Sequence, residues 1–124
     1  MTAARFAALA AFSLLVTAPA VAQPAAITID VTNFAFAPKP IHLAAGRPVT
    51  LNFVNRSSSR HDFTARNFFA ASAISGAMPA NGAIDLAPHQ SRSITLTPRA
   101  GSYSAHCGHF MHKQFGMKTQ IIVN

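Results

Sequence analysis

Apolar and polar residues alternate in three separate segments of the chain, residues 27–31, 50–54 and 91–96. Successive side chains of a β-strand point to opposite faces, so this period predicts strands with one face in a core. Residues 120–123 form the last predicted strand, and its run of three apolar residues is compatible with burial on both faces. Between residues 67 and 77 alanine and phenylalanine are common and the alternation is absent. We expect one short helix or helical turn there.

Turn-forming residues separate these segments at short intervals. They are Pro38 and Pro40, Gly46 with Pro48, Gly76 to Pro79, Asn81-Gly82, Pro88, and Pro98 to Gly101. Short strands at this spacing predict an all-β sandwich or barrel of antiparallel type. Ten phenylalanines, with no tryptophan, would supply much of its core.

The first 22 residues do not follow this strand pattern. Arg5 precedes an apolar block over residues 6–16, and small residues then lead to Ala20-Val21-Ala22. A charged head, an apolar middle and an A-x-A exit are typical of a secretory signal peptide. The alternative of a membrane anchor is disfavoured, because the block is shorter than the ~20 residues of a spanning helix. We therefore predict a signal peptide over residues 1–22 and a single periplasmic domain over residues 23–124, without stable membrane insertion after cleavage.

The charge of the domain limits its partners. Without Arg5, nine Lys and Arg stand against three Asp and no Glu, which gives the domain a formal charge of +6. The arginines are scattered singly instead of forming a basic run, so we expect no nucleic-acid partner. A basic surface favours encounter with an acidic protein or an acidic membrane surface, and an ordinary solvated surface explains the charge equally well.

Cys107 is the one cysteine of the chain. Small exported domains commonly carry cysteines in disulfide-bonded pairs, but a single cysteine cannot form an internal bridge. A lone thiol in an oxidising compartment is exposed to oxidation unless it is buried or bound to a metal. Cys107 is therefore a candidate metal ligand.

Further candidate ligands lie close to Cys107 in the sequence. Residues 101–118 contain this thiol, three imidazoles and two thioethers. Such ligands suit copper in either oxidation state, whereas the scarcity of carboxylates disfavours calcium and magnesium. If residues 102–107 and 120–123 pair as strands, the loop between them can bind one ion through Cys107, His112 and Met117, in the pattern C-x4-H-x4-M.

His61 is the candidate for the fourth ligand, because it follows another predicted strand and a polar turn. Two His and one Cys in a plane, with a weak axial Met, are the arrangement of a blue-copper electron-transfer site. His109 competes with His112, since an extended Cys107-x-His109 places both side chains on one face. We favour His112, because a separation of two residues leaves little freedom to bring both donors to one ion. Met111 is interpreted as a packing residue.

These motifs resemble those of a known family. The chain contains Asn55, then His61-Asp62-Phe63, then Tyr103-x3-Cys107-x4-His112-x3-Gly116-Met117 and an apolar last strand. Together, these motifs resemble those of the plastocyanin/azurin family of cupredoxins. The resemblance covers nearly all of residues 27–124. It implies a Greek-key β-sandwich, one copper ion on His61, Cys107, His112 and Met117, and one-electron transfer.

Two positions depart from the family pattern. The family often has Asn after the first His ligand, where it helps to fix the Cys loop by hydrogen bonding, and here Asp62 stands in that place. A carboxylate accepts hydrogen bonds but donates none unless it is protonated, so we expect different hydrogen bonds there. The second departure is Thr119, where the family often has Gly.

Two functions follow from this interpretation. The first is an exported, monomeric blue-copper protein that carries one electron at a time between redox protein partners, including acidic ones. The second is a periplasmic copper-binding protein for delivery, storage or resistance, in which His106, His109 and Met111 give the metal a route in and out. We do not expect an enzyme, because Cys107 is better explained as a ligand than as a nucleophile and acids are too few for a Ser-His-Asp arrangement.

Overall fold

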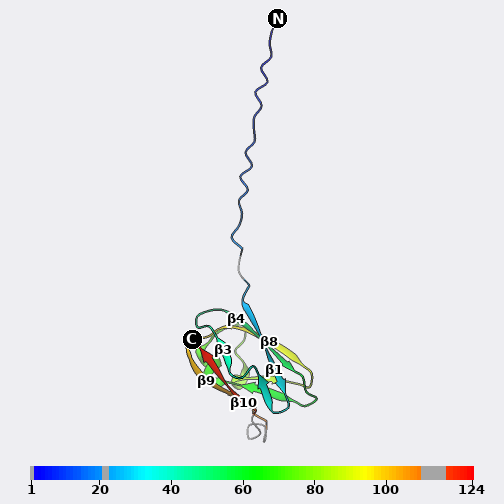
Figure 1. The fold of residues 1–124 in the computed structure, drawn as a ribbon, viewed down its shortest axis with the longest axis vertical. Coiled ribbons are helices and arrows are strands. Elements are labelled where there is room, and N and C mark those ends of the chain that lie inside the picture. The colour runs from blue at the N-terminus through cyan, green and yellow to red at the C-terminus, as the bar shows by residue number, and fades with distance from the viewer. Residues whose placement is uncertain (1, 21–22, 110–116) are drawn as a thin grey trace.

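Two five-stranded sheets face each other across a common core (Figure 1). The computed structural model describes residues 2–20, 23–109 and 117–124. Sheet A has the order β2 (Ala35–Ala37), β1 (Ala25–Thr32), β4 (Val49–Asn55), β8 (Ser91–Thr97) and β6 (Ala73–Ser75). Sheet B has the order β3 (Ile41–Leu43), β10 (Lys118–Val123), β9 (Gly101–His106), β5 (His61–Thr64) and β7 (Ala83–Leu86).

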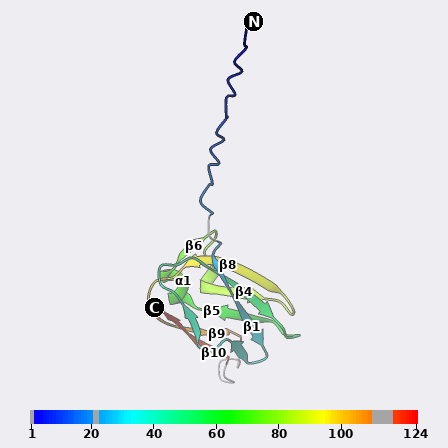
Figure 2. The same cartoon turned by 45° about the horizontal axis from the view of Figure 1, so that its top comes forward.

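The fold is a Greek-key β-sandwich, as predicted. Figure 2 shows its two layers, with β1, β4 and β8 in one and β5, β9 and β10 in the other. The three alternating segments of the sequence lie within β1, β4 and β8. The expected short helix is α1 (Arg66–Ala71), and a 3-10 turn, η1 (Ala80–Gly82), follows later.

The strand pairing is mixed, which corrects the prediction of an antiparallel sandwich. β1 runs parallel to β4, and β10 runs parallel to β3. Parallel neighbours need a crossover connection, and here the chain crosses to sheet B at β3 before it returns to sheet A at β4. Alternation along a strand reports which face is buried, so it carries no information on the direction of the neighbouring strand.

The burial of the last strand also differs from the expectation. The last strand was expected to be buried on both faces, but Ile121 and Val123 are buried while Ile122 between them is only half-buried. Ile122 faces outward from sheet B, next to His42 on β3. The predicted short helix is confirmed as α1, and after it the chain continues directly into β6, which pairs with β8.

Buried phenylalanines hold the two sheets together and position β5. Phe53, Phe63, Phe68 and Phe69 are fully buried. The ring of Phe63 on β5 lies 4.8 Å from that of Phe53 on β4, and 5.3 Å from that of Phe36 on β2 in an edge-to-face contact. These contacts fix β5 against sheet A, and with it the position of His61 at the first residue of β5.

The described N-terminal residues 2–20 contain no helix or strand and extend away from the sandwich (Figure 1). Their large apolar side chains are exposed, with Phe6 at 97% and Leu15 at 90% of full exposure. This segment contributes nothing to the core. Over the described ranges, none of the helices combines the length and the hydrophobicity needed to cross a bilayer.

Candidate metal centre

Cys107 and His61 lie side by side at one end of the sandwich. Cys107 follows the last residue of β9, and its Sγ lies 3.9 Å from Nδ1 of His61 on β5. Both residues are 1% exposed. Thiolate and imidazole ligands at about 2.3 and 2.1 Å from one ion, in a trigonal plane, stand about 3.8 Å apart. The pair therefore has the separation of two ligands of a single ion.

Met117 closes the loop that begins at Cys107. The backbone N–H of Cys107 donates a hydrogen bond of 3.0 Å to the carbonyl oxygen of Met117, and the Met117 side chain is fully buried. Three of the four predicted ligands thus belong to the same end of sheet B. His112 and Met111 lie outside the described residues, and the described part of the chain contains no cluster of three His, Cys, Asp or Glu side chains suited to a metal.

The surroundings of the Cys107 thiol act on its ionisation in two directions. Burial raises the pKa of the thiol, and the nearby Asp62 carboxylate adds to this effect. The backbone N–H groups of Asp62 and His109 lower the pKa by hydrogen bonding to the sulfur, the former at 3.5 Å. Burial is the largest effect, so the pKa is raised overall. A bound cation would reverse this balance, because metals take the thiolate form.

Asn33 contacts the other side of the His61 ring. Its Oδ1 lies 3.4 Å from Nε2 of His61, so the amide oxygen can accept a hydrogen bond from a protonated Nε2. That tautomer leaves the lone pair of Nδ1 directed toward Cys107. Asn33 lies in the tight turn between β1 and β2, where Phe34 has a φ of 64°. The sequence offered no signal for this role, because Asn is common in any turn.

Asp62 fastens the segment after Cys107 to β5. One carboxylate oxygen, Oδ1, accepts hydrogen bonds of 2.7 Å from the backbone N–H of Gly108 and from the Thr64 hydroxyl. This carboxylate acts as an acceptor only, as its chemistry predicts. A Cβ added at Gly108 would stand 3.1 Å from Oδ2 of Asp62, so the absence of a side chain allows this close approach.

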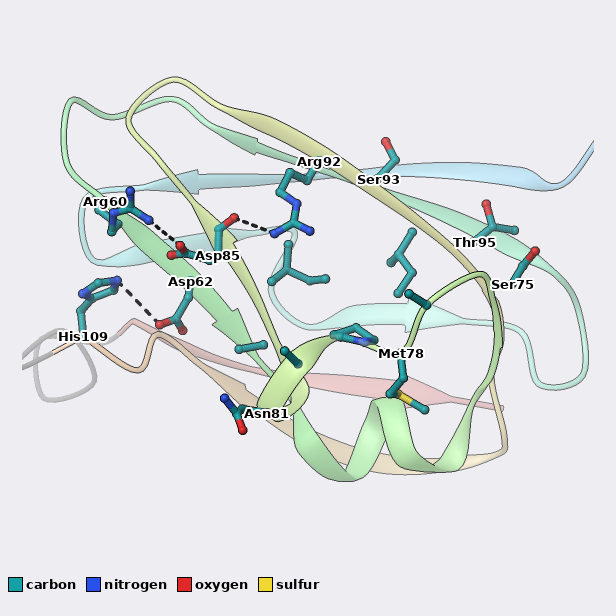
Figure 3. Close-up of a pocket in the computed structure, with 16 residues that line it drawn as sticks. Arg60, Asp62, Ser75, Met78, Asn81, Asp85, Arg92, Ser93, Thr95 and His109 are labelled. Atoms are coloured by element: carbon teal, nitrogen blue, oxygen red, sulfur yellow. Dashed lines mark hydrogen bonds and ion pairs between the residues drawn. The ribbon is translucent and has the colours of Figure 1, made fainter.

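His109 points toward Asp62 and an open pocket of about 810 Å³ (Figure 3). Its Nε2 lies 3.7 Å from Oδ2 of Asp62. The pocket lies between β7 and β8, and a pair formed by Arg60 and Asp85 borders it. Of the proposed ligands that the structure describes, none lines this pocket. The cavity is therefore separate from the pair formed by His61 and Cys107.

The other described histidines do not belong to the buried pair formed by His61 and Cys107. His42 is exposed on the outer face of β3, and His89 is exposed in the turn before β8 with a φ of 59°. His106 is half-buried and is paired with Lys118 across β9 and β10. Thr119, the second departure from the family pattern, is buried within β10 and leaves the strand intact.

Comparisons with known proteins agree with this architecture. The chain matches the cupredoxin-like domain family over residues 5–123. Among solved structures it is similar to auracyanin B, with 23% identity, a TM-score of 0.61, and coverage of 85% of this chain and 93% of that chain. It is also similar to dithionite-reduced auracyanin from the photosynthetic bacterium Roseiflexus castenholzii, with 22% identity, a TM-score of 0.63, and coverage of 83% and 99%. No curated protein sequence matches. At this level of identity, the similarity shows a shared fold.

Proposed function

Because the chain belongs to the cupredoxin-like domain family, we propose that it is an exported blue-copper electron carrier that binds one copper ion through His61, Cys107, His112 and Met117. The observation that carries the proposal is the buried pair at one end of the sandwich, with Sγ of Cys107 at 3.9 Å from Nδ1 of His61. Bound copper would supply one-electron chemistry by alternating between Cu(II) and Cu(I). The similarity to an auracyanin studied in its dithionite-reduced form agrees with a redox role.

The protein's contribution is to hold the ligands still. Asn33 orients the imidazole of His61, and Asp62 ties the segment after Cys107 to β5. Ligands fixed by strand ends and hydrogen bonds move little when the charge of the centre changes, which favours rapid electron exchange. Met117 is fully buried at the end of the loop, and its thioether would serve as a weak fourth ligand to copper.

His112 is proposed as the third ligand in preference to His109. The ring of His109 lies beside the Asp62 carboxylate at the border of the open pocket. Ligation by His109 would require this ring to leave Asp62, whereas His112 stands five positions from both Cys107 and Met117 in the sequence. This position supports the spacing C-x4-H-x4-M as the ligand pattern.

A periplasmic copper-binding protein for delivery, storage or resistance is the second candidate function. The observation that favours it is the side chain of His109, which is 35% exposed two residues from Cys107. A solvent-accessible imidazole beside a buried site could pass a metal ion in or out. The two functions differ in how tightly the protein retains Cu(I).

Export by removal of residues 1–22 is part of the proposal. The exposed apolar side chains of residues 2–20 support it, because cleavage would remove them without loss of any core contact. The intact mass of the protein in the periplasmic fraction tests this step. A mature chain that begins at Gln23 is expected, and a full-length cytoplasmic product would contradict it.

Absorption spectroscopy of the copper-loaded protein tests the ligand set. Cys107→Ser should abolish the intense charge-transfer band from thiolate to copper, and His61→Ala and His112→Ala should disrupt it. His42→Ala and His89→Ala are matched controls on exposed histidines and should leave it unchanged. Loss of the band in His109→Ala, with retention in His112→Ala, would show that the third ligand is wrongly assigned.

Voltammetry and a chelator competition separate the two functions. A carrier of electrons should show reversible one-electron voltammetry, lose no copper over many cycles and transfer Cu(I) only slowly to a competing chelator. Prompt loss of Cu(I) together with sluggish electron exchange would favour the copper-delivery function.

A further inference from the structure

We propose that a groove on the outer face of sheet B, between Lys39 and Lys118, is the surface on which an acidic redox protein docks. The groove has a volume of about 440 Å³ and lies over β9 and β10. Its lining includes these two lysines, His106, Pro40 and Ile122. The inference rests on the proposed function and adds to it the location and the chemistry of the partner's binding surface.

The groove is next to the candidate metal centre. Lys118 directly follows Met117, and its partner across the strands, His106, directly precedes Cys107. Lys39 comes just before β3, which runs parallel to β10 with Ile41 paired to Ile121. All three basic residues therefore lie at the end of sheet B that carries Cys107. A partner in the groove would contact residues bonded directly to two proposed ligands.

The charge of the groove is positive and uncompensated. Asp30 pairs with Arg56 and Asp85 pairs with Arg60, while Asp62 is engaged with Gly108. Within the described residues, no carboxylate lines the groove, and neither Lys39 nor Lys118 has an ion-pair partner.

A positive surface without internal counter-charges attracts an acidic partner and raises its rate of association. The apolar surface of Pro40 and Ile122 within the groove adds area that a protein segment can cover. Both lysines are exposed, so neither contributes to the core and each can be changed without loss of the fold. These features fit an acidic segment of a protein partner.

The probe for the test is a hexaglutamate peptide, titrated at low ionic strength into the full chain labelled with nitrogen-15. The copper-free and Cu(I) forms are both diamagnetic and are both measured. We expect the largest amide shift changes at Lys39, His106, Lys118 and Gln120, and a loss of binding as salt is added. Lys39→Glu and Lys118→Glu should each weaken binding by about tenfold.

Arg47→Glu is the matched control, because it changes the net charge by the same amount. Arg47 is exposed just before β4, whose first residue pairs with Ala25, at the end of the sandwich away from Asn33 and His61. Binding should weaken by less than about twofold in this variant. An equal loss in Arg47→Glu, or shift changes centred outside the groove, would overturn the proposal.

Measurements on the copper-free and Cu(I) forms distinguish an error in the proposed docking surface from an error in the proposed function. A protein that forms the blue centre but does not bind the peptide in the groove would overturn the docking surface alone. A protein that binds the peptide there in the copper-free form, but never forms a blue centre, would overturn the electron-carrier function and uphold the groove as a site for acidic segments.

Discussion

Gly108 donates its backbone N–H to Oδ1 of Asp62 at 2.7 Å, and this hydrogen bond joins the segment after Cys107 to the strand that begins with His61. The same oxygen accepts the Thr64 hydroxyl at 2.7 Å. Asp62 and Gly108 each directly follow a proposed ligand, His61 and Cys107 in turn. One carboxylate therefore holds the two ligand-bearing segments together.

Removal of this carboxylate should destabilise the copper-free protein. We expect Asp62→Ala to lower the free energy of unfolding by about 1–3 kcal/mol, because the Gly108 N–H loses its acceptor. Asp62→Asn should retain most of the stability, since its amide oxygen can accept the same bonds. Urea unfolding provides the measurement. Asp30→Ala, which removes an exposed ion pair with Arg56, is the control and should cost less than about 1 kcal/mol. Equal losses in Asp62→Asn and Asp62→Ala would contradict the role as acceptor.

The close approach of Asp62 to Gly108 predicts a coupled pair of substitutions. In Gly108→Ala the new Cβ would stand 3.1 Å from Oδ2, so the carboxylate must shift or the segment must move. We expect this variant to be destabilised in the presence of Asp62 and nearly neutral in the Asp62→Ala background. Unfolding free energies of the four proteins should give a coupling of about 0.5–3 kcal/mol. Strict additivity would show that the contact does not constrain the segment.

The sequence predicted the fold class, but it did not predict which strands lie next to each other or whether they run parallel. Alternation located β1, β4 and β8 because each buries one face. The parallel pairs could not be predicted, because they depend on where the chain crosses between the sheets. β2, β3 and β6 were missed because each has three residues, too few for a period to be visible.

The sequence pointed to three residues that the structure brings to one end of the sandwich, His61, Cys107 and Met117, but not to the groups around them. Cys107, Met117 and His61 have distinctive side chains, and the loop spacing joins the first two. The comparison with the family pattern singled out Asp62, but it did not predict that Gly108 is its hydrogen-bond partner. Asn33 lies 28 residues from His61 in the sequence, and only the folded turn brings its amide to the imidazole.

Burial of the Cys107 thiol predicts a loss of stability at alkaline pH in the copper-free protein. The pKa of this thiol is raised above its ordinary value of 9.0 in the folded state, chiefly by desolvation. Above that value the unfolded chain releases the thiol proton while the folded chain retains it, so rising pH favours unfolding until the folded thiol also ionises. Urea unfolding of wild type and Cys107→Ser provides the measurement. The free energy of unfolding of wild type, relative to that of Cys107→Ser, should fall as the pH rises across this range. A difference that is independent of pH would contradict the assignment.

Met117→Leu should separate the packing of this side chain from its proposed role as axial ligand. Leu has a similar volume, so the fully buried site should lose less than about 1.5 kcal/mol of stability. The copper protein should keep some blue colour, because the thiolate of Cys107 remains, but its reduction potential should shift. Absorption spectroscopy and voltammetry give the two measurements. A variant with an unchanged potential would argue against Met117 as a ligand.

The contact between Asn33 and His61 predicts a tautomer that can be observed without copper. Because Oδ1 of Asn33 lies 3.4 Å from Nε2, the neutral ring should carry its proton on Nε2 and present an unprotonated Nδ1 toward Cys107. Asn33→Ala should reduce the share of this tautomer, as seen in nitrogen-15 NMR of the ring, and should lower copper affinity by about 10- to 100-fold. Asn33→Asp keeps an acceptor and should preserve both properties.

Thr32→Ala is the control for this prediction, because it alters the same turn without removing the acceptor. The Thr32 hydroxyl donates to the carbonyl oxygen of Ala35 at 3.4 Å, so this variant tests whether the turn alone positions the ring. If Thr32→Ala shifts the tautomer as far as Asn33→Ala does, the turn and not the amide orients His61. If only Asn33→Ala does so, one exposed side chain in the turn between β1 and β2 determines which nitrogen of the buried His61 faces Cys107.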